Sequence, residues 1–166
     1  MKHMWSEEEL QTLIEEQGGS AGSGGSTLDD IVDSKGNKRF IEGSGTPITQ
    51  EKWNSSYCKW SLSGTHLMCV FAGSVQNNAS LVNNQVLAEF PLPEYILNKI
   101  FPVFGGNYLD KRSFSFFKST GAITYQTLFV EKTQTGIRII NKETDQYNFI
   151  ADYYFRLQID LLIDTE

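Results

Sequence analysis

The last eighteen residues of the chain alternate between two kinds of side chain. One parity is apolar and the other is mostly polar, with Ile150 and Leu162 as the exceptions. The apolar parity consists of Phe149, Ala151, Tyr153, Phe155, Leu157, Ile159, Leu161 and Ile163. A period of two is typical of a strand with one face in a core and the other in water. About fifteen residues at ~3.3 Å each would span roughly 50 Å, and so long a strand needs several partners, so we predict a β protein.

Turn residues divide residues 27–166 into short alternating runs. Clusters of Gly, Pro, Asn and Asp recur about every 8 to 12 residues, a spacing typical of sandwiches and barrels. Aromatic residues make up 13% of the chain and lie mostly in these runs, which favours an aromatic core. We therefore predict an all-β fold of about eight to ten strands, arranged as an antiparallel β-sandwich in one domain.

Two predicted hairpins and one crossing are specific enough to test. Asp33 begins a turn that joins 28–32 to 38–42. A second hairpin joins 57–62 to 66–72. After a strand that ends at a Pro-Leu-Pro sequence, residues 94–100 are expected to form a single helical turn or an irregular crossing.

The N-terminal region lacks the alternating pattern of the rest of the chain. Residues 5–17 predict a short helix, because Ser6 and Glu9 have the spacing of a capping box. We therefore assign 1–17 to a helix that is a tag, a stem remnant or a fused peptide. Residues 18–26 contain only Gly, Ser and Ala, which is typical of a flexible and engineered linker, although a natural hinge is the alternative.

The chain has two cysteines, Cys58 and Cys69. If Ser63 and Gly64 form a two-residue turn, the two thiols oppose each other in a hydrogen-bonded pair, where the side chains diverge. The sequence therefore predicts two reduced, buried thiols.

Charge and composition argue against several classes of protein. The net charge is −6, whereas nucleic-acid binders show clustered Lys and Arg, and no apolar run approaches the ~20 residues of a membrane span. The N-terminus has no basic stretch followed by an apolar one, so no signal peptide is expected. His66 is the one histidine of the predicted domain and is expected on the surface or in a cross-strand contact. We expect no metal site, no cofactor and no catalytic residues.

A saccharide site is the most specific binding prediction that the residues support. Sugar-binding sites combine exposed aromatic faces with amide side chains. Trp53 is expected to be exposed, because it precedes the predicted strand, whereas Trp60 shares the core parity. The candidate ligand-binding residues are Trp53, Asn54, Tyr57, Lys59, Asn77 and Asn78.

Residues 33–100 resemble a known family. The sequences KGNKRFIEGSGTPIT, YCKWSLSGTHLMCVFAGSV and VLAEFPLPEYILNKIFPV are similar to head domains of tail-fibre and baseplate proteins of phages and prophages of Gram-positive bacteria. The similarity lies in the pattern W-x-L-S-G-x-x-L from Trp60 to Leu67 and in a corner that contains Pro93 and Pro102. It implies a jelly-roll-like sandwich, a homotrimer on a helical or fibrous stem, and a structural or host-saccharide adsorption role in the virion, made in the bacterial host cytoplasm.

Two alternatives remain open at the level of sequence. The first is a monomeric carbohydrate-binding module, which a solution mass would separate from a trimer. The second is a glycan hydrolase with a carboxylate pair, for which Glu94 and Asp110 are the residues to test.

Overall fold

The computed structural model describes residues 6, 8, 32, 33, 35–102, 106–150 and 152–163. The chain divides into two units, Met1–Ile41 and Glu42–Glu166, and nearly all strands belong to the second. The predicted helix and linker at 1–17 and 18–26 lie outside the described residues, apart from Ser6 and Glu8.

Eleven strands are present in the described part of the chain, with two short helical segments. The strands are β1 Phe40–Ser44, β2 Thr46–Pro47, β3 Trp53–Ser63, β4 His66–Val75, β5 Ser80–Leu81, β6 Val86–Pro91, β7 Tyr108–Phe117, β8 Ile123–Lys132, β9 Gly136–Asn141, β10 Tyr147–Asn148 and β11 Tyr153–Leu162. The 3-10 helix η2 spans Gln50–Lys52 and the α-helix α2 spans Glu94–Leu97. The predicted all-β fold is therefore confirmed, and so is the predicted helical turn after Pro93.

Nine of these strands form one sheet, in the order β1-β3-β4-β11-β7-β8-β9-β6-β2. Its two outermost strands, β1 and β2, are separated in sequence only by Gly45. One continuous segment therefore joins β3 at one edge of the sheet to β6 at the other. Gly45 donates its N–H to the Cys58 carbonyl at 2.9 Å, and a Cβ atom at Gly45 would lie 2.5 Å from Cys58 Sγ. Glycine at this position lets the segment change partner strands without a steric clash.

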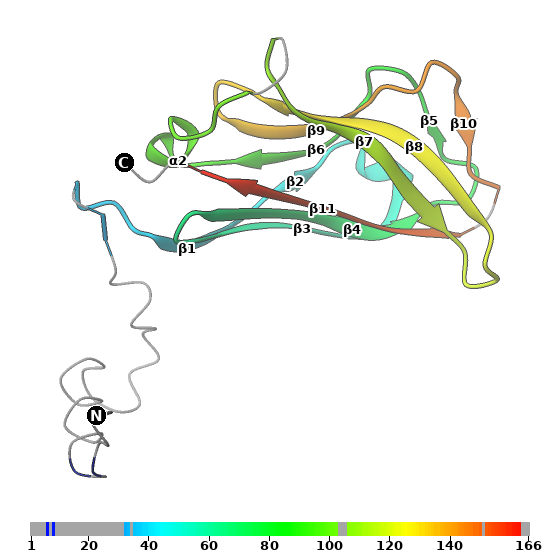
Figure 1. Cartoon of the computed structure of the whole chain (residues 1–166). Helices are drawn as coiled ribbons and strands as arrows, with labels where there is room; N and C mark the ends of the chain where they lie inside the picture. The colour runs from blue at the N-terminus through cyan, green and yellow to red at the C-terminus, as the bar shows by residue number, and fades with distance from the viewer. Residues whose placement is uncertain are drawn as a thin grey trace, which may run out of the picture. The chain divides into compact units, whose positions relative to one another are not determined.

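The sheet folds into two facing layers, as Figure 1 shows. One layer contains β3, β4 and β11, and the other contains β7, β8, β9 and β6. They meet where β11 pairs with β7, and within the described residues this pairing consists of Tyr154↔Phe117 and Phe155↔Phe116. The architecture is an antiparallel, jelly-roll-like β-sandwich, in which β5 and β10 form a small separate sheet.

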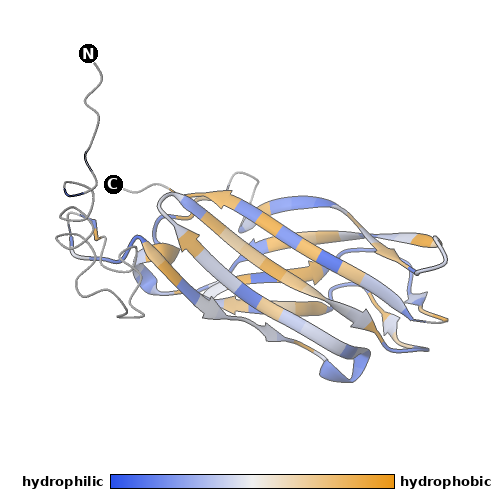
Figure 2. Cartoon of the chain, turned by 90° about the horizontal axis from the view of Figure 1, so that it is seen from below, coloured by the Kyte–Doolittle hydropathy of each residue, from blue (hydrophilic) through white to orange (hydrophobic). Residues whose placement is uncertain are grey.

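The core lies between the two layers and is aromatic. Trp53 and Phe155 each pack on Phe71, with ring centroids 5.2 Å and 4.8 Å away. Phe116 bridges Phe155 and Phe149 at 5.4 Å and 5.3 Å. Apolar and polar residues alternate along the long strands, visible as alternating orange and blue in Figure 2. This alternation is what a sheet with one buried face requires.

The final strand is shorter than its sequence pattern predicts. β11 spans ten residues, Tyr153–Leu162, whereas the alternation begins at Phe149. Phe149 is fully buried but follows the short strand β10 and donates its N–H to the Ala79 carbonyl. The prediction of a fifteen-residue strand is therefore wrong, because Phe149 packs in the core although it lies outside β11.

The predicted register of the β3–β4 hairpin is also wrong. Ser63 pairs with His66, so the turn consists of Gly64 and Thr65. Gly64 has a φ of +64°, and glycine at the first turn position is typical of a type II′ hairpin. Cys58 consequently opposes Phe71, and Cys69 opposes Trp60. Both thiols are nevertheless buried and free, as predicted.

The turn predicted at Asp33 is present. Asp33 Oδ1 accepts hydrogen bonds from the backbone N–H groups of Lys35 and Asn37, each at 2.9 Å, and Gly36 has a φ of +81°. Val32 and Lys38 form an isolated antiparallel bridge, and residues 28–31 lie outside the described residues. In the described part of the chain, no helix has the length and apolar character needed to span a membrane.

Candidate functional site

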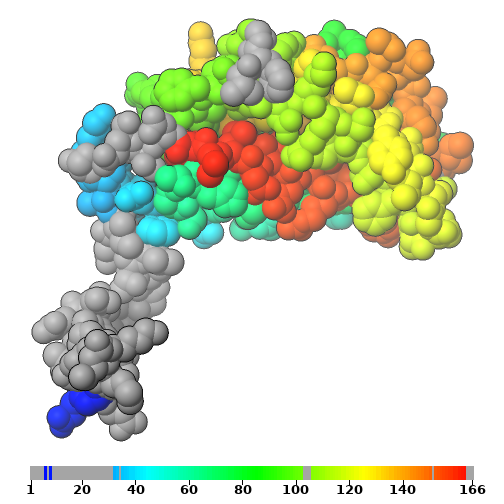
Figure 3. All heavy atoms as spheres, in the orientation of Figure 1, coloured from blue at the N-terminus to red at the C-terminus, as the bar shows by residue number. Residues whose placement is uncertain are grey.

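Large apolar side chains are exposed where β7 meets β11. Tyr154 pairs with Phe117, and Phe117 pairs with Ile123 across the β7–β8 hairpin. Their exposed fractions are 45%, 42% and 54%, and the Tyr154 and Phe117 ring centroids lie 6.3 Å apart. The side chains at these three positions therefore form a continuous apolar row across three strands. In Figure 3 the β7–β8 hairpin lies against the beginning of β11 at this end of the sandwich.

The apolar row continues into neighbouring positions that carry no charge. On β4, Ser74 pairs with Tyr154, and on β3, Ser55 pairs with Ser74, with the two hydroxyl oxygens 3.2 Å apart. On β8, Tyr125 is 61% exposed and pairs with Ser115 of β7.

Tyr57, which the sequence singled out, lies on the same outward parity of β3 as Ser55. It is 50% exposed and pairs with Ala72, which in turn pairs with Arg156 of β11. Lys59, also singled out, is exposed and places its Nζ 5.7 Å from the centre of the Tyr57 ring. We refer to Tyr57, Phe117, Ile123, Tyr125 and Tyr154 together as the aromatic face.

The prediction that Trp53 is exposed is wrong. Its side chain is only 5% exposed, and Nε1 donates a hydrogen bond to the Ile48 carbonyl at 2.9 Å. A β-bulge between Trp53 and Ser55 shifts the register by one residue. Because a shift of one residue exchanges the two faces of a strand, the indole turns into the core and cannot stack on a ligand.

The three predicted asparagines are exposed and lie near one another in the chain's fold. Asn54 Nδ2 donates to the Val75 carbonyl at 3.3 Å, and Asn77 follows Val75 by two residues. Asn78 has a φ of +65° and donates its N–H to the Phe149 carbonyl at 2.7 Å. The backbone of Asn78 therefore has a structural role in this turn, while its side chain is exposed to solvent.

The acidic residues considered for catalysis lie in separate elements, Glu94 in α2 and Asp110 in β7. Asp110 forms an ion pair with Arg112 at 3.1 Å, and Glu94 is exposed at the first position of α2. His66 Nε2 lies 2.8 Å from Asp160 Oδ1, a cross-strand contact of the kind expected from the sequence. Within the described ranges, no group of His, Cys, Asp and Glu residues has the geometry to hold a metal ion.

Burial makes both thiols poor nucleophiles. Desolvation raises the pKa of Cys58 to about 12. The pKa of Cys69 is also raised to about 12, first by burial and then by the nearby Cys58 and Asp160. Because the thiolate is the reactive form, neither group is activated at neutral pH.

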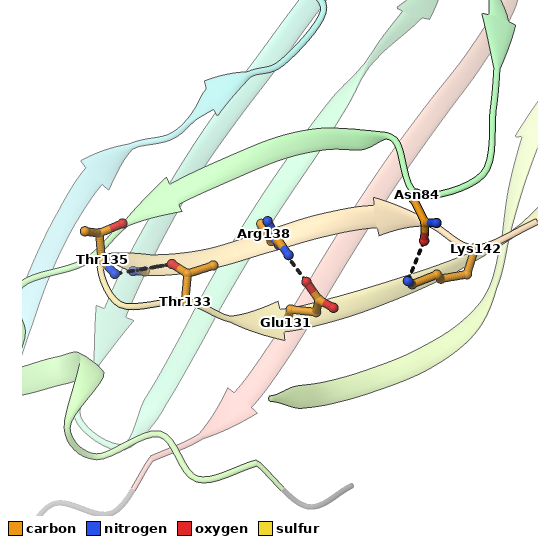
Figure 4. A network of polar contacts seen from close by, with 7 residues as sticks. Asn84, Glu131, Thr133, Thr135, Arg138 and Lys142 are labelled. Carbon is orange, nitrogen blue, oxygen red and sulfur yellow. Dashed lines mark hydrogen bonds and ion pairs between the residues drawn. The ribbon is translucent and has the colours of Figure 1, made fainter. Parts of the chain in front are cut away.

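A polar network lies along β8 and β9, away from the aromatic face (Figure 4). Arg138 Nε donates to Glu131 Oε2 at 2.6 Å, and Lys142 Nζ donates to Asn84 Oδ1 at 2.6 Å. Glu131 is 9% exposed, so its charge is compensated by Arg138 rather than by water.

Sequence reasoning missed four members of the aromatic face, namely Phe117, Ile123, Tyr125 and Tyr154. For two of these residues, Phe117 and Tyr154, the sequence contains a pattern that predicts exposure. Phe116-Phe117 and Tyr153-Tyr154 are aromatic doublets, and alternation places one member of each doublet on the solvent side.

The sequence matches no family model, and no curated protein shows significant similarity to it. Among solved structures, the chain is similar to the bovine atadenovirus type 4 fibre head protein, with 9% sequence identity and a TM-score of 0.30. The match covers 71% of this chain and 97% of that chain. At this TM-score the likeness decides neither fold nor function, and both rest on the chain's own geometry.

Proposed function

We propose that the chain is a non-enzymatic virion protein, the receptor-binding head of a tail or fibre. In this proposal it assembles as a homotrimer and adsorbs to a saccharide of the host cell envelope. The observation that carries the proposal is the aromatic face, whose five side chains are each between 42% and 61% exposed. Clustered apolar surface of this kind is typical of interaction sites rather than of free monomers.

The composition of the aromatic face suits a contact between copies of the chain. The row from Ser55 to Ile123 contains no charged residue, whereas the neighbouring row, which begins at Tyr57, contains Arg156. Protein interfaces have the same arrangement, with an uncharged, aromatic centre and a polar rim. A closed trimer would bury this surface without leaving copies free to add indefinitely.

The chemistry of the side chains supports a binding role over catalysis. Asp110 and His66 are each engaged by a neighbour, and the thiols are buried with raised pKa values. The alternative of a monomeric carbohydrate-binding module is favoured by one observation, the exposed Tyr57 ring with Lys59 beside it.

Light scattering on the purified chain separates the two candidates. The proposal predicts a mass of three chains, each of 18.8 kDa, at micromolar concentration. A mass of one chain over the whole concentration range would contradict the trimer and favour the monomeric module. Incubation with a broad glycan panel tests the absence of catalysis, since turnover that is lost on Glu94→Gln or Asp110→Asn would identify a hydrolase.

A further inference from the structure

A cleft of about 550 Å³ is bordered by residues 97–102 and Asn107 on one side and by the turn that joins β8 to β9 on the other. Its lining residues are Leu97, Asn98, Pro102, Asn107, Lys132, Thr133 and Gln134. The volume lies within the range of about 300–1,000 Å³ that is usual for small-molecule sites. The cleft contains none of the residues that the sequence singled out for binding.

Hydrogen bonds connect the two walls of the cleft. The Lys132 N–H donates to the Asn107 carbonyl at 2.8 Å, and Lys132 Nζ donates to the Ile100 carbonyl at 2.9 Å. On the other side of the crossing, the Leu92 N–H donates to the Thr135 carbonyl at 3.0 Å. The described residues of the crossing that follows β6 are thus tied to the β8–β9 turn at several points.

The turn itself fixes the hydroxyl of Thr133. Thr133 Oγ1 accepts hydrogen bonds from the N–H groups of Gly136 at 3.0 Å and Thr135 at 3.3 Å (Figure 4). A hydroxyl oxygen accepts two hydrogen bonds and donates one. Because both acceptor positions are occupied, the Thr133 hydroxyl hydrogen is left to donate.

The lining chemistry matches a polyhydroxylated ligand. Asn98, Asn107 and Gln134 contribute three amides, each able to donate to and accept from neighbouring hydroxyl groups. Leu97 and Pro102 supply apolar surface for the carbon skeleton. Among the described residues that line the cleft, none is a carboxylate and one, Lys132, carries a positive charge.

Lys132 adds a preference for negative charge. Its ammonium group has three N–H donors, and one of them is used by the Ile100 carbonyl. The remaining donors suit a carboxylate or phosphate, to which charge-assisted hydrogen bonds form. The net charge of −6 on the whole chain disfavours a polyanion, so a ligand with a single acidic group fits best.

We propose that this cleft binds a saccharide carrying one acidic substituent. The inference rests on the proposed adsorption role and gives it a site and a ligand class. The aromatic face is then left to contacts between copies of the chain.

Saturation-transfer NMR with two matched pairs of sugars tests the proposal. The probes are galactose against galacturonic acid, and glucose against glucose 6-phosphate, so a carboxylate and a phosphate are each compared with a neutral partner. We expect each acidic sugar to bind about tenfold more tightly than its neutral counterpart, the effect of one charge-assisted hydrogen bond. Lys132→Met should abolish that difference, and Lys132→Arg should retain most of it.

Variants of matched chemistry locate the site. Asn98→Ala and Gln134→Ala should weaken binding of both members of a pair, by about threefold to tenfold. Asn83→Ala removes the same amide from an exposed turn outside the cleft and should leave binding unchanged. Thermal unfolding of each variant verifies that the fold is retained. If Lys132→Met does not fold, Gln134→Ala, which lies in an exposed turn, still tests whether the cleft is the binding site.

Each contrary outcome has a separate meaning. If Asn77→Ala or Tyr57→Ala weakens binding and Asn98→Ala does not, the cleft is overturned but adsorption stands. Equal binding of neutral and acidic sugars overturns the proposed ligand class. If none of the four sugars binds saturably, the cleft proposal fails. The adsorption role is judged separately by binding of the wild-type chain to a broad glycan panel, and assembly by the solution mass.

Discussion

Two aromatic pairs lie back to back where β7 meets β11. Phe116 and Phe155 point into the sandwich and are 0% and 3% exposed, whereas Phe117 and Tyr154 point outward and are 42% and 45% exposed. The ring centroids are 5.4 Å apart in the inner pair and 6.3 Å apart in the outer pair. The same two strands thus carry equivalent residues on both faces, in opposite environments.

The difference between the pairs separates folding from assembly. The inner pair is fully covered by other core residues, so a single chain already gains its burial free energy. The outer pair gains comparable free energy only when another molecule covers it, because apolar surface contributes in proportion to the area removed from water. Substitutions in the inner pair should therefore change folding stability, and those in the outer pair should change association.

The largest expected effect is on the inner pair. Phe116→Ala should lower the free energy of unfolding by about 3–5 kcal/mol, since it removes a fully buried ring that packs on Phe149 and Phe155. Urea denaturation at a fixed, low protein concentration measures this loss. The matched substitution Phe117→Ala should cost less than about 1 kcal/mol under the same conditions. Similar losses at the two positions would contradict the assignment of separate roles.

The next effect is on association. Phe117→Asp places a charge in the centre of the aromatic face and should weaken assembly by about 2–4 kcal/mol, the range of an interface hot spot. Light scattering over a dilution series should show the mass of the variant falling toward one chain at concentrations where the wild type remains assembled. Lys111→Asp, which changes an exposed charge elsewhere on β7, is the control and should retain the wild-type mass.

The third effect is on folding stability and concerns the buried charge of Glu131. This residue lies near the C-terminal end of β8, whereas the aromatic face includes residues near the N-terminal end of that strand. Glu131→Ala leaves Arg138 without its 2.6 Å partner and should destabilise the fold by about 1–3 kcal/mol. This loss is smaller than that expected for a fully buried pair, because the Arg138 side chain is 37% exposed. Glu89→Ala, opposite Arg138 on β6 but exposed, should change the midpoint of thermal unfolding very little. Equal shifts for both variants would show that the buried ion pair does not stabilise the fold.

The smallest effect concerns the buried thiols and appears only at alkaline pH. The folded-state pKa values of Cys58 and Cys69 are raised to about 12 from an ordinary value of 9.0. Because the unfolded chain loses these protons first, the stabilisation they give is fully present below pH 9 and is lost as pH rises toward 12. Cys69→Ala should therefore show a shallower decline of unfolding free energy with pH over this window than the wild type. Parallel declines would contradict the raised pKa of Cys69.

The sequence predicts the fold class well because period-two alternation is a local property. In β11 the parity assignment holds at Phe155, Leu157 and Ile159, which are all nearly or fully buried. The first residue of the strand could not be predicted in the same way, because Phe149 is buried in the core although it precedes the first residue of β11, Tyr153. Alternation reports which side chains face inward and not which backbone groups are paired.

Register and exposure depend on contacts that local patterns do not contain. Gly64 could occupy either turn position, and the choice of the first position moved the partner of Cys58 by two residues. The bulge at Trp53 depends on pairing with Val75, twenty-two residues later, and it reversed the face on which the indole lies. The aromatic face was only partly foreseen, through Tyr57, because its other members come from the β7–β8 hairpin and from β11, which are distant in sequence from β3 and from each other.

Hydroxyl-radical footprinting of the wild-type chain tests the central claim most directly. Oxidation of Phe117, Tyr125 and Tyr154 is followed by mass spectrometry at concentrations where light scattering gives the assembled and the single-chain mass. We expect these three side chains to be strongly protected in the assembled sample and to become reactive on dilution, while the buried Phe116 stays unreactive in both. Unchanged oxidation of the outer residues across an assembly transition, or protection of a different surface, would contradict the claim that the aromatic face joins copies of the chain.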